Sequence, residues 1–207
     1  MRGEGTNLAR ELTSPLATSR SAVAMLLAED LGKLNDGQRE YLEHVLQLDD
    51  FMIGLITSWS DIERLSNGQV MLNIEPCNIG SAAAALLPVT RSGQWPMVLA
   101  DPLRLRQILM NCLNCLKNPA VRARITGDVC VLTLEDRTMR SHDDRADMIL
   151  ALQGEATAAF LGLRIARLLA EAHGGSLQLD PHAANGTKLR LRLPLAKQMS
   201  LLGDAAE

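Results

Sequence analysis

The sequence predicts an α+β protein in which a long helical hairpin precedes a domain that mixes a sheet with helices. Over the first third of the 207 residues, apolar side chains recur mostly three, four or seven positions apart, as in amphipathic helices. Beyond this region, short apolar or alternating segments are mixed with helical ones in no strict strand–helix–strand order. The turn Ser66-Asn67-Gly68 separates the two patterns. We therefore expect two domains, residues 1–67 and 68–207.

The first predicted helix begins near Asn7 and ends near Leu31. Pro15 lies inside it and lacks a backbone donor, so we expect the helix to bend or restart there. The segment 32–37 contains a glycine followed by Asn35 and Asp36, which is typical of a connector that leads into a helix N-cap. The residues of the apolar face share helical spacing: Leu8, Leu12, Leu16, Val23, Leu26, Leu27 and Leu31.

The second predicted helix runs from about Gln38 to Leu65. Its apolar positions cover more than half of the helix circumference, which is more than one partner helix covers. The apolar residues that the first helix leaves uncovered predict self-association, most simply as a dimeric four-helix bundle. These positions are Tyr41, Leu42, Val45, Leu48, Phe51, Met52, Leu55, Ile56, Trp59 and Ile62.

The second domain is predicted to be one sheet covered by helices. In its last strand, Lys188, Arg190 and Arg192 alternate with leucines, so one face of the sheet should be wet. The expected strands are Gln69–Glu75, Met97–Leu99, Val129–Leu134, Ser176–Leu179 and Lys188–Leu193, and the expected helices are Ile79–Leu87, Leu103–Lys117 and Ala156–His173.

The composition excludes several classes of protein. Apolar residues make up 47% and the net charge is −3, so the chain is neither disordered nor broadly basic, and nucleic acid is not an expected partner. Aromatic residues make up only 2%, which argues against a base-stacking platform or a carbohydrate cleft. No apolar run approaches the ~20 residues of a membrane span. The four cysteines, without a secretory pattern, indicate reduced thiols, so we expect a cytoplasmic protein.

Three motifs, in this order and spacing, resemble the core of a bacterial sensor histidine kinase over residues 8–195. Arg10-Glu11-Leu12-Thr13-Ser14-Pro15-Leu16 is similar to the family's phosphoacceptor box, and residues 100–111 are similar to its N box. Residues 162–175 with Asn185-Gly186-Thr187 and Leu193-Pro194-Leu195 are similar to its closing segment. The resemblance implies a dimerisation and phosphoacceptor hairpin followed by an ATP-binding domain of the histidine-kinase type.

Arg10 stands where the family has its phosphoacceptor histidine. A neutral imidazole nitrogen is a nucleophile, whereas a guanidinium stays protonated because its pKa lies above about 12. Autophosphorylation at this position is therefore excluded by chemistry, and no catalytic residue is predicted.

The nucleotide motifs also depart from the family. Cys115 stands where the family's asparagine meets Mg²⁺, and a thiol is a poor ligand for that hard cation. The Asp-x-Gly-x-Gly loop is similar to residues 136–140, which keep Asp136 and lose both glycines. The phosphate loop is similar to residues 158–162, where only Gly162 remains and Phe160 brings a ring. The stretch between Asp136 and Ala158 is short for an ATP lid, so we expect no cofactor.

Cysteines and histidines offer alternative sites. Cys112 and Cys115 share a helix face and form a zinc site only if Cys77 and Cys130 join them, so we prefer buried apolar thiols and predict no metal site. His44 is the only candidate for a displaced phosphoacceptor, although a solvated helix histidine is the preferred interpretation. Of the remaining histidines, His173 is expected at a helix C-terminus with a partly positive ring, His142 in a charged loop and His182 in a turn.

The first hypothesis for function is a catalytically inactive, histidine-kinase-like dimer that binds a response-regulator receiver domain or a sensor histidine kinase. Its partner-binding residues would be Arg10, Glu11, Thr13 and Ser14, since the resemblance implies docking around the box and a receiver's active site is acidic. An ordinary solvated charge is an equally strong interpretation of Arg10. Two alternatives remain: a phosphotransfer protein that relays phosphate without ATP, or a residual ATP-binding kinase that keeps Asn111, Asp136 and Gly162.

Overall fold

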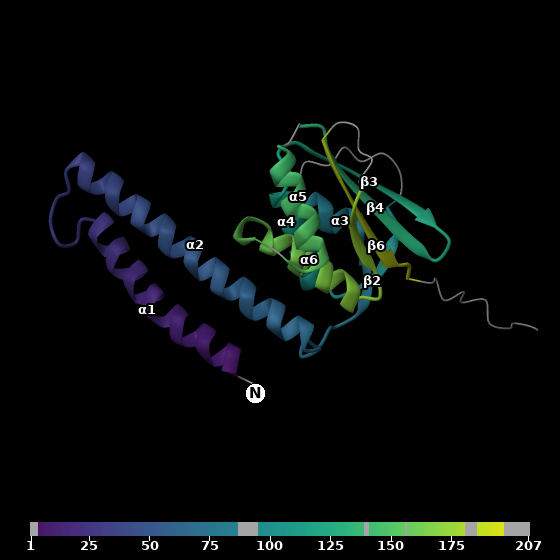
Figure 1. The fold of residues 1–207 in the computed structure, drawn as a ribbon, viewed down its shortest axis with the longest axis horizontal. Helices are drawn as coiled ribbons and strands as arrows, with labels where there is room; N and C mark the ends of the chain where they lie inside the picture. Colours follow the sequence, from purple (N-terminus) through teal and green to yellow (C-terminus); the bar gives the residue numbers. More distant parts are fainter. Residues whose placement is uncertain (1–3, 87–94, 139–140, 156, 181–185, 197–207) are drawn as a thin grey trace, which may run out of the picture. The chain divides into compact units, whose positions relative to one another are not determined.

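The computed structural model describes residues 4–86, 95–138, 141–155, 157–180 and 186–196. The predicted fold class is confirmed: a helical hairpin precedes an α/β sandwich (Figure 1). By their internal contacts the residues divide into two compact units, Met1–Gln69 and Val70–Glu207.

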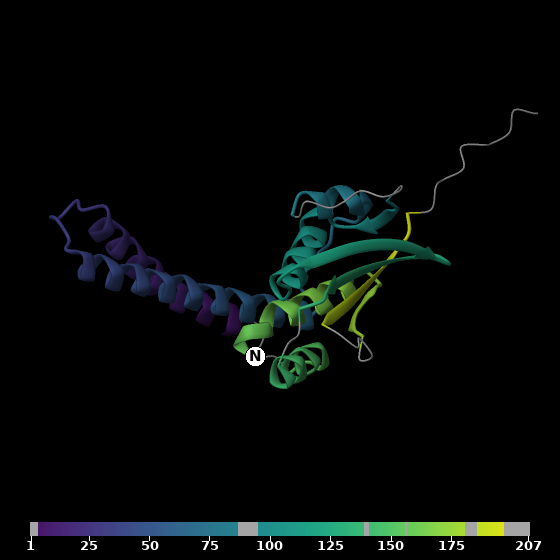
Figure 2. The same cartoon turned by 90° about the horizontal axis from the view of Figure 1, so that it is seen from above.

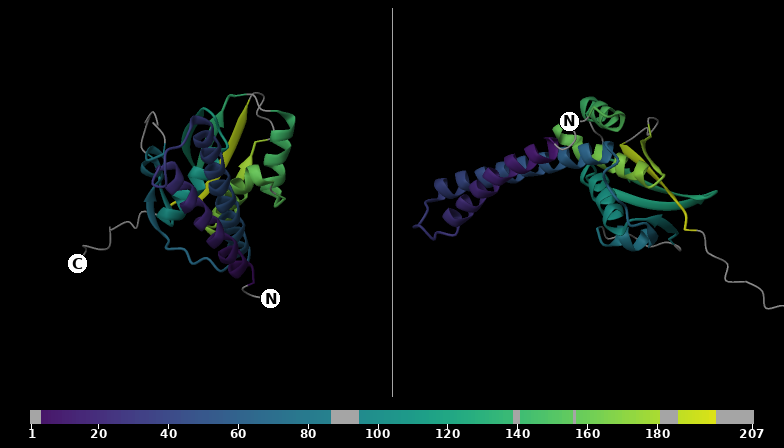
Figure 3. Two further views of the ribbon diagram at one scale, coloured as in Figure 1. Left: turned by 90° about the vertical axis from the view of Figure 1, so that its left-hand side faces the viewer. Right: turned by 90° about the horizontal axis from the view of Figure 1, so that it is seen from below.

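The first unit consists of α1 (Glu4–Leu27) and α2 (Asp36–Ser66), which lie side by side along their length (Figure 3). Asn35 caps α2 as expected: its Oδ1 accepts the Gln38 N–H at 2.8 Å, and Gln38 Oε1 accepts the Asn35 N–H at 3.0 Å. Of the two alternatives expected at Pro15, the restart is wrong, because α1 is one helix that includes this proline, and the bend remains a prediction. α1 also ends four residues before Leu31.

One ion pair joins α1 to α2, and a second joins α2 to the connector between them. Arg20 Nε contacts Asp50 Oδ1 at 2.5 Å, and Arg39 Nη2 contacts Glu29 Oε1 at 2.6 Å. Several large apolar side chains of the hairpin remain exposed, with Tyr41 at 70% exposure and Phe51 at 55%. This exposure fits the expected helix–helix association, which remains a prediction. The other exposed apolar side chains of α2 are Leu48, Met52 and Trp59.

The second unit contains two antiparallel sheets. The smaller one pairs β1 (Glu75–Asn78) with β2 (Met97–Ala100). The larger one has the strand order β3-β4-β6-β5, in which β3 (Pro119–Thr126) and β4 (Val129–Asp136) form a long curved hairpin (Figure 2). Beside it lie β6 (Thr187–Pro194) and, at the edge, β5 (Ser176–Leu179).

Helices cover one face of the larger sheet, and the core lies between them. α4 (Pro102–Asn114) and α6 (Leu161–Ala172) pack against each other on this face (Figure 1). α5 (His142–Gln153) packs on α6 and β5, and α3 (Ile79–Ala84) packs on α4. The fully buried side chains are mainly leucines, as the low aromatic content requires: Leu105, Leu109, Leu132, Leu134, Leu163, Leu169, Leu189, Leu191 and Leu193.

The structure corrects several expected elements. Residues 69–74 form no strand, and β1 begins only at Glu75. β3 and α5 were not predicted, and His142 is the first residue of α5 rather than part of a loop. The expected helix Ala156–His173 is a short 3₁₀ turn (Ala158–Phe160) followed by α6. His182 lies outside the described residues.

His173 is buried and neutral, which corrects the expected partly positive ring. Its Nε2 accepts the Asp101 N–H at 3.1 Å, so the proton lies on Nδ1, which donates to Leu169 O at 2.6 Å. The Asp101 carboxylate in turn caps α4 by accepting the N–H groups of Leu103 and Arg104, and it also accepts the Asn73 N–H. The hydrogen bond between Asp101 and His173 thus joins the start of α4 to the end of α6.

Within the described residues, no single helix is long and apolar enough to cross a membrane. α5 and α6 match the length and composition of a span only as a pair bent by 67°. Their side chains Met148, Leu163 and Leu169 are fully buried in the core of the second unit.

Candidate functional site

The residues similar to a phosphoacceptor box lie near the start of α1. Arg10, Glu11 and Ser14 are exposed, and Arg10 makes no ion pair with the described residues. Positions 10, 13 and 14 share one helix face because they are three and four residues apart. Thr13 is half-buried, and its hydroxyl donates to Ala9 O at 2.7 Å. Arg10 and Ser14 are therefore the exposed polar side chains of this face.

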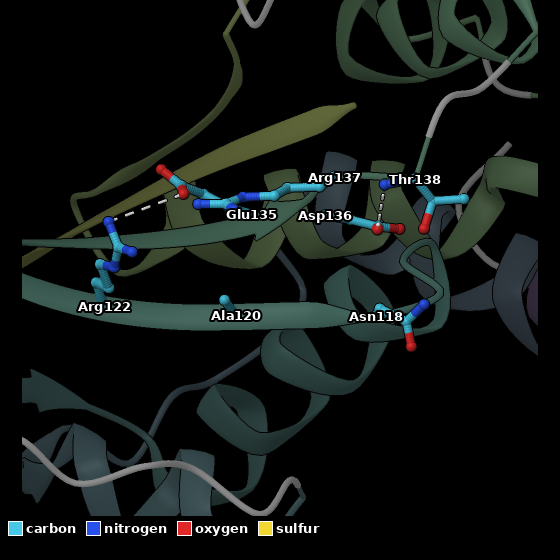
Figure 4. A pocket seen from close by; sticks show the side chains of 7 residues that line it. All are labelled: Asn118, Ala120, Arg122, Glu135, Asp136, Arg137 and Thr138. Carbon is cyan, nitrogen blue, oxygen red and sulfur yellow. Dashed lines mark hydrogen bonds and ion pairs between the residues drawn. The ribbon is translucent and has the colours of Figure 1, made fainter. Parts of the chain in front are cut away.

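Asp136 ends β4 and is only 1% exposed. Its Oδ2 accepts the Lys117 N–H at 2.7 Å, and its Oδ1 accepts the Thr138 N–H at 2.8 Å (Figure 4). Burial by itself raises the pKa of this carboxyl, but the hydrogen bonds from Thr138 and Lys117 outweigh burial and hold the pKa below its ordinary value. The carboxylate therefore joins the end of α4 to the turn after β4.

Gly186 presses directly against the backbone of Asp136. It has φ +85°, and a Cβ at this position would overlap the carbonyl oxygen of Asp136. The next residue, Thr187, begins β6 and pairs with Asp136 across the sheet. The glycine of the closing segment thus allows β6 to approach the end of β4.

Asn111 and Gly162 are brought together by the packing of α4 on α6. A Cβ built on Gly162 would lie 3.0 Å from Asn111 Oδ1. These residues match the N box and the phosphate loop of the resemblance, so the structure places one residue of each motif side by side.

Phe160 and Cys115 fill positions where the resemblance has a glycine and a metal-binding asparagine. Phe160 closes the 3₁₀ turn before α6 and is only 6% exposed, so its ring belongs to the core. Cys115 is the C-cap of α4, is buried, and its thiol donates to Asn111 O at 3.3 Å. The Cys115 thiol thus bonds to the backbone of its own helix.

The other cysteines are also packing residues. Cys112 and Cys130 are fully buried, and burial raises the pKa of both thiols, that of Cys130 to about 11. Burial is also the main reason why the pKa of Cys77 is raised. Across the parts of the chain that the structure describes, no group of three or more Cys, His, Asp or Glu side chains is arranged to hold a metal ion.

His44 is exposed on α2. Its exposure agrees with the preferred interpretation of a solvated helix histidine.

Two neighbouring hollows lie on the strands β3, β4 and β6. One, of about 430 Å³, is lined by Asp136 and Thr138 with side chains of β3 and β4, including Arg122 and Glu135 (Figure 4). The other, of about 330 Å³, shares Arg122 and Glu135 and continues toward β6. Sequence reasoning missed the contribution of β3, although Val121, Ala123 and Ile125 alternate there with Arg122 and Arg124.

Comparison with known proteins agrees with this fold. Residues 100–197 match the family model described as histidine kinase-, DNA gyrase B- and HSP90-like ATPase. An uncharacterized sensor-like histidine kinase of Rhizobium meliloti is 27% identical, over 90% of this chain and 41% of its own length. The circadian input-output histidine kinase CikA of Synechococcus elongatus is 24% identical, over 90% of this chain and 29% of its own.

Solved structures show the same architecture. Full-length ShkA in complex with AMPPNP aligns with a TM-score of 0.66 at 22% identity, covering 93% of this chain and 46% of ShkA. The histidine kinase AdeS of Acinetobacter baumannii aligns with a TM-score of 0.57 at 13% identity, covering 87% and 95%. This chain spans less than half the length of the two curated relatives.

The fold and these matches make the chain similar to histidine kinases. In its fold it resembles the two solved kinase structures, because a helical hairpin precedes a domain that matches the ATPase family model.

Proposed function

We propose that this chain is a catalytically inactive member of two-component signalling, which acts in the cytoplasm as a dimeric binding module for a receiver domain or a partner kinase. The observation that carries the proposal is Arg10, an exposed guanidinium on α1 in the place of the phosphoacceptor histidine. A group that stays protonated accepts no phosphoryl group.

The proposed loss of ATP binding is supported by the carboxylate of Asp136, which is buried and hydrogen-bonded to the backbone. In the family this aspartate reads the adenine, whereas here both oxygens already accept backbone N–H groups, from Lys117 and Thr138. Phe160 fills the core where a phosphate loop needs bare backbone, and the Cys115 thiol is a poor substitute for an oxygen ligand of Mg²⁺. Three defects of different kinds thus act against the binding of Mg·ATP.

The binding side of the proposal rests on the exposed face around Arg10 and Ser14. An arginine presents five donors and a fixed positive charge, which suits an acidic active-site pocket such as that of a receiver domain. Thr13 lies half-buried on the same face, and Glu11 is exposed next to Arg10 in the sequence. The exposed apolar side chains of α2 provide the surface for dimerisation, with Tyr41, Phe51 and Trp59 as its aromatic members.

The purified chain is expected not to bind ATP in the presence of Mg²⁺. Isothermal titration calorimetry up to millimolar nucleotide should show no saturable heat, and ATP should not raise the melting temperature, because a ligand of the native state stabilises it. A micromolar dissociation constant for Mg·ATP would refute the inactive-kinase proposal. Phosphate on His44 after mixing with a phosphorylated receiver domain would refute it in favour of the relay.

Arg10→Glu is expected to weaken binding of a cognate receiver domain by about tenfold or more, because it places a like charge at an acidic pocket. Calorimetry or surface plasmon resonance with receiver domains encoded beside this gene measures the effect. Lys33→Glu is the matched control, since Lys33 is exposed in the connector at the opposite end of α1. Equal affinities of the two variants would show that the docking surface does not include Arg10.

A further inference from the structure

The open face of the larger sheet gathers basic side chains from two strands that flank β4. In the strand register, Arg122 of β3 and Arg190 of β6 stand on either side of Thr133 of β4. Two residues further along, Arg124 and Arg192 flank Val131 in the same way. The sequence pattern showed only the β6 part of this arrangement, because β3 was not predicted.

Three of these arginines, together with Lys188 of β6, line the hollow of about 330 Å³, which we call the cationic hollow. Its polar lining consists of Arg122, Arg124, Lys188, Arg190, Thr133 and Glu135. Four cations thus face one carboxylate, whereas ordinary solvated surfaces intersperse the two signs. The whole chain has a net charge of −3, so this local excess of positive charge runs against the overall balance.

The carboxylates that contact the cationic hollow hold its cations in place but do not neutralise them. Glu135 contacts Lys188 Nζ at 3.1 Å and Arg122 Nη1 at 4.0 Å, and Asp180, beyond the rim, contacts Arg190 Nη2 at 2.6 Å. Arg124 makes no ion pair with any residue that the structure describes. Two carboxylates therefore form ion pairs with three of the four cations.

The chemistry of the lining selects a small oxyanion. Guanidinium groups match the oxygens of phosphate with paired N–H donors, and the Thr133 hydroxyl adds a donor between Arg122 and Arg190. Among the residues that the structure describes, no aromatic side chain lines the cationic hollow, so this lining offers no stacking surface for a base. A volume of about 330 Å³ accommodates one or two phosphoryl groups and lies at the lower end of ligand sites.

We propose that the cationic hollow is a binding site for a phosphate-bearing small molecule, with the phosphoryl oxygens held by Arg122, Arg190 and the Thr133 hydroxyl. The cationic hollow is independent of the proposed docking function, because its lining includes neither Arg10 nor a residue of the nucleotide motifs.

Pyrophosphate is the probe for this site, titrated by calorimetry into the full chain at constant ionic strength. We expect saturable binding, weakened by about tenfold or more in the variant Arg122→Gln, because charge-assisted hydrogen bonds to phosphate are lost. Arg192→Gln is the matched control: it removes a positive charge from the same sheet face but does not line the cationic hollow. This control should keep the affinity of the unaltered chain.

Three outcomes would overturn the proposal. The first is a lack of saturable pyrophosphate binding at millimolar concentration. The second is an equal loss of affinity in the Arg192→Gln control, which indicates a diffuse surface potential. The third is co-sedimentation with phosphatidylglycerol vesicles without binding of pyrophosphate, which assigns the cations to a lipid surface instead. None of these results depends on whether ATP or a receiver domain binds.

Discussion

Gly186→Ala is expected to lower the free energy of unfolding of the second unit by about 3 kcal/mol, although it adds only one methyl group. Two costs combine at this position. The backbone has φ +85°, a left-handed conformation that side chains other than glycine rarely adopt. The added Cβ would also overlap the carbonyl oxygen of Asp136 and push β6 away from the end of β4. Urea denaturation followed by circular dichroism measures the loss.

Gly127→Ala is the matched control for this prediction. Gly127 also has a positive φ, +59°, in the turn between β3 and β4, but a Cβ there would meet no atom within 4 Å. Its substitution should therefore lower the free energy of unfolding by about 1 kcal/mol, because only the strain of the left-handed backbone is added. Equal destabilisation by the two substitutions would mean that the close approach of Gly186 to Asp136 contributes nothing, and that β6 does not depend on a bare backbone to reach the end of β4.

The strongly periodic elements of the fold were predicted correctly from the sequence. α2 has apolar residues at helical spacing behind a capping residue, Asn35, and β6 alternates leucines with basic residues. Both signals are local, because a helix or a half-buried strand imposes its period on every residue in it. The capping box of α2 and the buried leucines of β6 follow directly from those signals.

The missed elements have physical reasons. The apolar residues of α5 are consecutive, from Met148 to Leu152, so the helix shows no amphipathic spacing. β3 does alternate, but it is an edge strand whose Ile125 stays exposed, which weakens the contrast between its faces. Residues 69–74 alternate as a strand would, yet the Asn73 N–H binds the carboxylate of Asp101 rather than a neighbouring strand.

The candidate site was predicted only as far as its motifs reach. The sequence locates Asn111, Asp136 and Gly162, and the resemblance predicts that Arg10 stands at the position of the phosphoacceptor. It contains no local signal for the hydrogen bond from the Lys117 N–H to Asp136, since these residues lie nineteen positions apart and meet only in the folded domain. The partner-binding role of Arg10, Glu11, Thr13 and Ser14 remains a prediction.

Asp136→Asn is expected to lower the free energy of unfolding by about 3 kcal/mol at neutral pH, although it changes no more than one oxygen to nitrogen. Both carboxylate oxygens accept backbone N–H groups at a site that is 1% exposed. An amide has one acceptor oxygen, so its NH₂ group must face one of these donors, from Lys117 or Thr138. Asp128→Asn is the control: Asp128 is exposed at the turn of the same hairpin, and its change should stay within about 0.5 kcal/mol.

The same carboxylate sets an expected acid dependence. The pKa of Asp136 in the folded chain lies below its ordinary value, so near pH 4 and below the unfolded chain binds more protons than the native one. The stability that Asp136 contributes is therefore complete above about pH 5 and is lost as the pH falls through the folded pKa. Asp101 contributes to the same loss of stability in acid. Burial raises the pKa of its carboxyl, but hydrogen bonds from the N–H groups of Asn73, Arg104 and Leu103 outweigh burial and lower the pKa.

Urea denaturation at a series of pH values from neutral to about 3 separates the two aspartates, because Asp136→Asn should flatten the acid slope without abolishing it. An unchanged slope would show that Asp136 is protonated equally in both states, and that its oxygens are not held by the backbone. An aspartate that is 1% exposed also presents little of its carboxylate to a base. The structural role of Asp136 and the expected failure to bind ATP therefore follow from the same buried carboxylate.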